Sequence, residues 1–186
     1  MNFYKIVNTK GNYGIFWKNG INEDQHDFIY PYGIYYAKEY IFNWSHLGDE
    51  VYIINTLSQQ TQHPKTNPIK YRSKKVEMIF FGKLNDPDTI KMMVNDGVIL
   101  TSQNNKLIKV SAKNGWLNNL IYFHSIGIDL TMNNSYLFRI AAKHNRLETM
   151  KYLYSIGCES DSVNNNALKL ATLHNNKEVI SYLSGL

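Results

Sequence analysis

Residues 134–163 read NSYLFRIAAKHNRLETMKYLYSIGCESDSV, and residues 104–132 before them read NNKLIKVSAKNGWLNNLIYFHSIGIDLTM, which is a near-copy. A third, shorter copy at residues 164–186 reads NNNALKLATLHNNKEVISYLSGL. Apolar positions recur at one fixed offset, as in the sets Ile108, Phe138 and Leu168; Val110, Ile140 and Leu170; and Leu120, Met150 and Ile180. Self-similarity with a period of about 20 to 50 residues predicts a solenoid, in which each unit buries its apolar face against its neighbours.

Each unit is predicted to fold as two helices joined by a polar turn. In the second full unit, residues 137–142 form a short apolar helix that His144-Asn145-Arg146 closes. A second helix follows over Leu147–Ser155, with its apolar residues at helical spacing. Gly157 then fits the left-handed position that ends a helix, as Gly97 and Gly127 do in their units.

The repeats extend towards the amino terminus, because the segment Asp86–Gly97 matches the second half of a unit at the same offset. Asp86-Pro87 is a good helix start, since the aspartate offers a side-chain acceptor and proline lacks only an N–H that would be unsatisfied there. We therefore predict a domain over residues 80–186, with repeats at about 80–103, 104–133, 134–163 and 164–186.

The string Ala141-Ala142-Lys143-His144-Asn145-Arg146-Leu147-Glu148, followed by Tyr152-Leu153 and Ile156-Gly157, resembles the ankyrin repeat. The consensus of that family has paired alanines, a Gly-His turn, a Leu-Leu pair and a closing Gly-Ala. The resemblance implies an all-α solenoid of helix pairs that binds proteins. Two departures predict shortened or loop-like connections in place of regular hairpins: the Thr-Pro-Leu-His opening is absent, and the period is shorter than the roughly 33 residues of that family.

Residues 1–79 contain no repeat and are predicted to form a small, strand-rich mixed domain, so the expected fold class is α+β. The predicted strands are Phe3–Val7, Gly14–Trp17, Gly33–Ala37 and Glu50–Ile54. A short amphipathic helix is predicted over Lys38–Leu47 and a polar loop over Ser58–Pro68. The segment Lys75–Phe81 is either a last strand or the joint to the repeats.

The same residues carry a second resemblance. The opening Phe3-Tyr4-Lys5-Ile6, then GIFWKNGINED at residues 14–24 and GIYYA at residues 33–37, resemble the amino-terminal domain of ankyrin-repeat proteins in giant viruses of amoebae, of the mimivirus type. The asparagine-rich composition of the chain fits that family. The resemblance implies a binding protein with a host or viral protein partner, placed in the host cytoplasm, the virus factory or the virion.

Composition predicts a soluble intracellular protein without membrane association. No apolar run suits a secretory signal or a bilayer span, and the single Cys158 excludes an intramolecular disulfide framework. The net charge of +5 and the isoelectric point near 9.1 come from dispersed lysines. This dispersion favours a solvated surface over a nucleic-acid site.

One segment suggests an enzyme. Tyr32-Gly33-Ile34-Tyr35-Tyr36-Ala37, followed by a predicted helix and strand, resembles the middle of the ADP-ribosyltransferase core, where a tyrosine stacks on nicotinamide. The resemblance also requires an early His or Arg and a late Glu, whereas the early strand has Tyr4-Lys5-Ile6 and the only late candidate is Glu77. An active or degenerate transferase therefore stays an alternative, beside the interpretation that Tyr35 and Tyr36 are ordinary strand aromatics, one facing in and one out.

No other catalytic, cofactor or metal motif is visible. The recurrence of His144 and His174 indicates common descent of the repeats more than ligation, and neither a phosphate-binding loop nor a nucleophile elbow is present. We therefore expect no catalytic residues, no cofactor and no metal.

Basic residues occupy two repeat positions. Lys109, Arg139 and Lys169 share one, and Lys83, Lys113 and Lys143 share the other. These columns are either a solvated face or a basic stripe for an acidic partner, and Lys109, Lys113, Arg139, Lys143 and Lys169 are the candidate partner-binding residues.

The sequence thus predicts a non-enzymatic protein–protein interaction module. The alternative is a structural subunit of a larger viral assembly that self-associates through the carboxyl-terminal repeat. That repeat carries the apolar residues Val179, Ile180, Leu183 and Leu186. Some of these side chains are expected to face inward, and the outer surface of the last helix pair is expected to offer apolar surface to a second copy.

Overall fold

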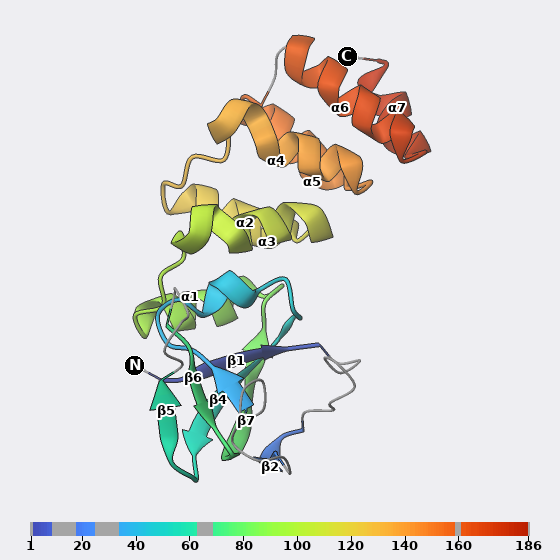
Figure 1. Ribbon diagram of the computed structural model, residues 1–186. Helices are drawn as coiled ribbons and strands as arrows, with labels where there is room; N and C mark the ends of the chain where they lie inside the picture. The colour runs from blue at the N-terminus through green and yellow to red at the C-terminus, as the bar shows by residue number, and fades with distance from the viewer. Residues whose placement is uncertain (1, 9–17, 25–33, 63–68, 159–160, 186) are drawn as a thin grey trace. The chain divides into compact units, whose positions relative to one another are not determined.

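The computed structural model describes residues 2–8, 18–24, 34–62, 69–158 and 161–185. Its strands precede its helices, and the α+β class is confirmed (Figure 1). The chain divides into two compact units, Met1–Leu107 and Ile108–Leu186. The sequence prediction placed the boundary between residues 79 and 80, a point that lies inside strand β7 (Lys75–Lys83).

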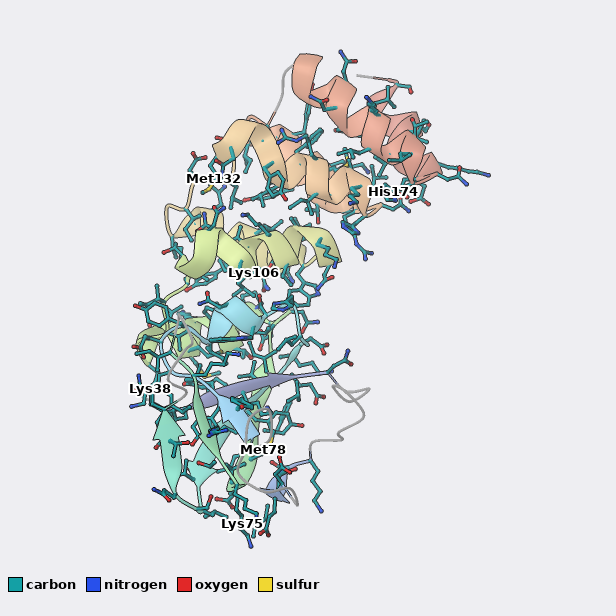
Figure 2. The ribbon with its side chains drawn as sticks, viewed as in Figure 1. Lys38, Lys75, Met78, Lys106, Met132 and His174 are labelled. Atoms are coloured by element: carbon teal, nitrogen blue, oxygen red, sulfur yellow. The ribbon has the colours of Figure 1, made fainter. Side chains whose placement is uncertain are left out.

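Two antiparallel sheets form the strand-rich part. The larger has the order β1-β4-β7-β2, from β1 (Tyr4–Val7), β4 (Glu50–Thr56), β7 (Lys75–Lys83) and β2 (Gly20–Glu23). The smaller has the order β3-β6-β5, from β3 (Ile34–Tyr36), β6 (Tyr71–Ser73) and β5 (Gln60–Gln62). Val76 and Met78 alternate with more exposed residues on β7, and both are buried in a cluster with Tyr36 and Ile54. Met78 is labelled in Figure 2. Period-two burial of this kind holds one face of a sheet against the core.

Two local predictions for this part were wrong. The α-helix expected over Lys38–Leu47 is only a 3₁₀ turn, Ile41–Trp44. Ile41, Phe42 and Asn43 are buried in succession, whereas an amphipathic α-helix buries only one side. The loop expected over Ser58–Pro68 contains β5, an edge strand of polar residues whose sequence lacks the apolar alternation of a half-buried strand.

The other strand predictions have mixed outcomes. Those over Phe3–Val7, Gly33–Ala37 and Glu50–Ile54 are confirmed by β1, β3 and β4, and Lys75–Phe81 is a strand. The one over Gly14–Trp17 lies outside the described residues.

The helices repeat with the period of the sequence. The second helices of the units begin at the same repeat position each time: α1 (Pro87–Asn95), α3 (Leu117–Ser125), α5 (Leu147–Ser155) and α7 (Lys177–Leu183). Between them lie α2 (Ser102–Asn114), α4 (Met132–Lys143) and α6 (Asp161–Leu173). In the second compact unit α4 packs against α5 and α6, α6 packs against α7, and α3 packs against α5.

The same repeat position is buried in each of the second helices. Met93, Phe123, Leu153 and Leu183 are all buried, one on each of α1, α3, α5 and α7. The predicted helix start is confirmed, since the Asp86 carboxylate accepts hydrogen bonds from the Asp88 N–H and the Thr89 hydroxyl. Gly97, Gly127 and Gly157 follow these helices with φ of +95°, +85° and +97°, a region that residues with a Cβ adopt at a steric cost.

Candidate protein-interaction surface

The first helices of the pairs carry one of the two predicted basic columns. Lys109 of α2 and Arg139 of α4 both face the ring of Tyr136, with Lys109 Nζ 5.4 Å and Arg139 Cζ 5.6 Å from its centroid. Tyr136 is 39% exposed, so its ring holds the two cations together at the surface. Lys169 is exposed on α6 and lines a separate groove. The structure therefore brings two of these three residues together.

The second column lies at the carboxyl ends of the first helices. Lys113 is in the last turn of α2 and Lys143 in that of α4, and both are exposed. Lys83, the third member, ends strand β7. The helix-end column therefore consists of Lys113 and Lys143 alone.

A repeated turn joins the two helices of each pair. Its left-handed residue is Gly115, Asn145 or Asn175, which occupy the same repeat position with φ of +76°, +56° and +55°. Asparagine tolerates this conformation better than most residues with a side chain, which explains its recurrence at the turn.

The residue after the left-handed position links neighbouring repeats. Arg146 Nε donates to the Lys113 carbonyl at 3.0 Å. Asn176, at the same position of the next repeat, donates through Nδ2 to the carbonyls of Ala142 and Lys143, at 2.7 and 3.0 Å. Both donate to carbonyls of the last helical turn, which have no N–H partner four residues further along the helix. The turns at Asn145 and Asn175 are thereby fixed against the helix end of the preceding repeat.

Basic side chains gather around the turns that join the two helices of each pair. Two of them, His144 and Arg146, were not among the predicted binding residues. Burial, followed by the charges of Lys113, Lys143, Arg146 and His174, holds the pKa of His144 below its ordinary value. His174 lies at the equivalent turn after α6 (Figure 2). The signal that could have found His144 and Arg146 is their place in the inter-helix turn, next to the lysine column.

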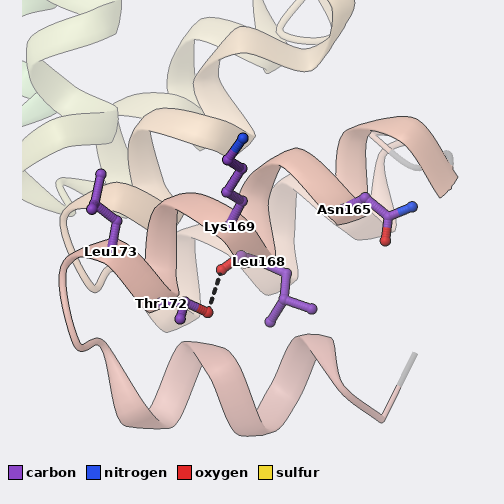
Figure 3. A pocket seen from close by; sticks show the side chains of 5 residues that line it. All are labelled: Asn165, Leu168, Lys169, Thr172 and Leu173. Atoms are coloured by element: carbon purple, nitrogen blue, oxygen red, sulfur yellow. Dashed lines mark hydrogen bonds between the residues drawn. The ribbon is translucent and has the colours of Figure 1, made fainter.

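A shallow groove on α6 is lined by Asn165, Leu168, Lys169, Thr172 and Leu173 (Figure 3). Leu173 is 76% exposed. The repeat counterparts of Leu168 and Thr172 are Phe138 and Ala142, which are fully buried on α4, the helix against which α6 packs. At Leu168 and Thr172 the groove is therefore the counterpart of a face that is buried on α4, whereas the counterpart of Leu173 is the exposed Lys143.

The two tyrosines of strand β3 differ in burial. Tyr36 is buried and its hydroxyl lies 2.6 Å from Ser73 Oγ, whereas Tyr35 is half-buried on the same strand. The Tyr35 carbonyl accepts from Lys5 Nζ at 2.9 Å, and burial, followed by the charge of Lys70, lowers the pKa of Lys5 to about 7. Glu77 on β7 accepts from Asn55 Nδ2 at 3.0 Å across the sheet.

Three further findings concern metal binding, membrane spans and similarity to known proteins. Within the described ranges, no group of three or more His, Cys, Asp or Glu side chains is placed to hold a metal ion. None of the helices in those ranges combines the length and the apolar character needed to cross a membrane. No protein-family model matches the chain, and no curated protein or solved structure matches it significantly.

Proposed function

We propose that the protein is a non-enzymatic interaction module of the ankyrin-like type, whose helix pairs form a short solenoid that binds another protein. The single observation that carries the proposal is the recurrence, at one fixed period, of helix starts, buried positions and turn geometry from α1 to α7. Arrays of helix pairs present an extended surface on which exposed residues vary while buried ones repeat. The resemblance to ankyrin-repeat proteins of giant viruses makes a host or viral protein the expected partner.

The proposed contact residues are those on the first helices. Tyrosine and arginine are enriched among residues that dominate binding energy, because they offer large contact area and directional hydrogen bonds. Tyr136 and Arg139 supply this pair, with Lys109 on the neighbouring helix.

Affinity capture from infected amoebae with the tagged chain tests the proposal. We expect Tyr136→Ala with Arg139→Glu to remove specific partners, because the pair contributes both contact area and charge. The matched control is Lys18→Gln with Lys91→Gln, two exposed lysines at other sites. A captured set that the first-helix variants leave unchanged would contradict the proposal.

A second candidate function is self-association as a structural subunit, favoured by the α6 groove and by the exposure of Leu173. Because Phe138 and Ala142 are buried at equivalent positions, the groove has the residue pattern of a face that packs against a helix. Light scattering on the purified protein should show a dimer that Leu173→Glu converts to a monomer. A monomeric wild-type protein at high concentration would contradict this role.

A further inference from the structure

The inter-helix turns place five basic side chains along one edge of the second compact unit. They come from three consecutive repeats, and we call them the turn-edge cluster: Lys113, Lys143, His144, Arg146 and His174. The other four members are all close enough to His144 to disfavour its protonated form. The hydrogen bonds from Arg146 and Asn176 to the preceding helix ends hold the turns in register.

The cluster lacks acidic compensation among the described residues. None of the interactions that shift the pKa of His144 involves a carboxylate. Glu148, in the first turn of α5, is engaged by Lys151 Nζ at 2.8 Å, and Glu178 is exposed in the first turn of α7. Like charges held together repel one another, and an external anion relieves that repulsion.

We propose that the turn-edge cluster binds an acidic polypeptide segment, and that protonation of His144 tightens this binding. The inference rests on the proposed interaction role, to which it adds the chemistry of the partner. Three of the five groups, Lys113, Lys143 and Arg146, are lysine or arginine cations. That number is small beside the roughly six to ten phosphate contacts of proteins that bind nucleic acid strongly, so carboxylates suit the cluster better.

The spacing of the cluster also suits a peptide. Packed helices lie about 8–10 Å apart, and a peptide in the polyproline II conformation places every third residue on the same face at a spacing of about 9 Å. A segment with a glutamate at every third residue therefore presents one carboxylate to each repeat.

The proton coupling follows from the same geometry. At neutral pH, burial and the surrounding cations keep the His144 ring mostly neutral. Carboxylates brought to the cluster favour the protonated ring, so binding takes up a proton and becomes tighter as the pH falls. Glutamate side chains stay ionised down to about pH 4.3, so His144 takes up its proton while the peptide keeps its charge.

The test is fluorescence anisotropy with the purified full chain and a rhodamine-labelled peptide that carries glutamate at every third residue. We expect binding at about pH 5.5 to be about three- to tenfold tighter than at pH 7.5, since one linked proton changes affinity by at most about tenfold per pH unit. Lys113→Gln with Lys143→Gln should weaken binding at both pH values by about three- to tenfold. His144→Gln should reduce the ratio between the affinities measured at the two pH values.

The controls separate the outcomes. Lys18→Gln with Lys91→Gln removes the same charge elsewhere, His124→Gln removes a histidine of α3, and a peptide with glutamine in place of glutamate removes the carboxylates. Three results would overturn the inference. The control lysine pair could weaken peptide binding as much as the cluster pair does, or His144→Gln could leave the pH dependence unaltered. The protein could also bind a single-stranded DNA oligonucleotide more tightly than the glutamate peptide. This assay uses only the purified chain and a defined peptide. A negative result therefore does not decide the proposed interaction role, which the capture experiment with the first-helix variants tests separately.

Discussion

Truncation of Phe138 to alanine measures how strongly neighbouring repeats depend on each other. The Phe138 side chain is fully buried on α4, which packs against α6, and its ring lies 6.5 Å from that of Tyr154 on α5. Removing a fully buried phenylalanine costs about 3–5 kcal/mol, because apolar contacts are lost and a cavity remains. A domain of this size has a free energy of unfolding of about 5–15 kcal/mol, so Phe138→Ala should shift the urea transition of the helical circular dichroism signal strongly.

The repeat supplies its own comparison. Leu168 occupies the equivalent position on α6 but is only half-buried, so Leu168→Ala should cost about 1 kcal/mol, near the centre of the range for point substitutions. Ile121, 43% exposed on α3, serves as a surface control whose substitution by alanine should change stability by about 0.5 kcal/mol or less. Equal costs for Phe138→Ala and Leu168→Ala would refute the assignment of these positions to a buried and an open face.

Four further outcomes are expected. Asp86→Ala should lower the free energy of unfolding by about 1 kcal/mol in urea titrations, since it removes the helix cap of α1, whereas Asp86→Asn should not. Cys158 is fully buried and burial raises its thiol pKa, so a thiol reagent such as dithionitrobenzoate should label it only after unfolding. The pKa of His144 is lowered in the folded protein, so the unfolded chain binds that proton more tightly. The contribution of neutral His144 to the free energy of unfolding is complete above about pH 6.5 and should be lost as the pH falls through the folded pKa. His144→Gln should flatten this part of the curve of stability against pH. Arg146→Asn copies Asn176, so it should keep wild-type stability in thermal unfolding but weaken binding of the glutamate peptide. Arg146→Ala should reduce both the stability and the affinity for the peptide.

The helices could be predicted from the sequence because their signals are local and repeated. Leu147–Ser155 was predicted residue for residue, since Arg146 closes the turn before it and Gly157 supplies the positive φ after it. Signals of this kind depend on a few neighbouring residues, and the fixed repeat offset gave several copies of each.

The sheets were harder to predict, because pairing joins residues far apart in the chain. Strand β6 (Tyr71–Ser73) is very short, and its place between β3 and β5 depends on partners outside its own stretch of sequence, as in the pairs Ile34↔Ser73 and Gln60↔Ser73. No local pattern marks such a strand. The same difficulty explains the 3₁₀ turn at Ile41–Trp44, where tertiary burial on several sides overrides the short helical pattern.

The candidate surface was predicted only in part, for a related reason. The sequence identified the lysine columns because they recur at the repeat period. It could not show that Tyr136 holds Lys109 and Arg139 together, since that contact joins different repeats through side-chain direction. Nor could it show that His144 lies among basic side chains from three repeats.

Arg146 and Asn176 occupy the same repeat position, and each makes a hydrogen bond to the preceding repeat, but only Arg146 is charged. The arginine uses one of its N–H donors to satisfy the Lys113 carbonyl, and asparagine performs the same bonding at the next repeat without charge. Because a neutral amide suffices for the link, the guanidinium charge is not required for the fold at this position. A cation at a helix carboxyl end does interact favourably with the helix dipole, but at an exposed site this is worth only about 0.3–1 kcal/mol. The charge of Arg146 beside Lys113 and Lys143 also adds repulsion, which is consistent with the proposal that the turn-edge cluster binds an acidic segment.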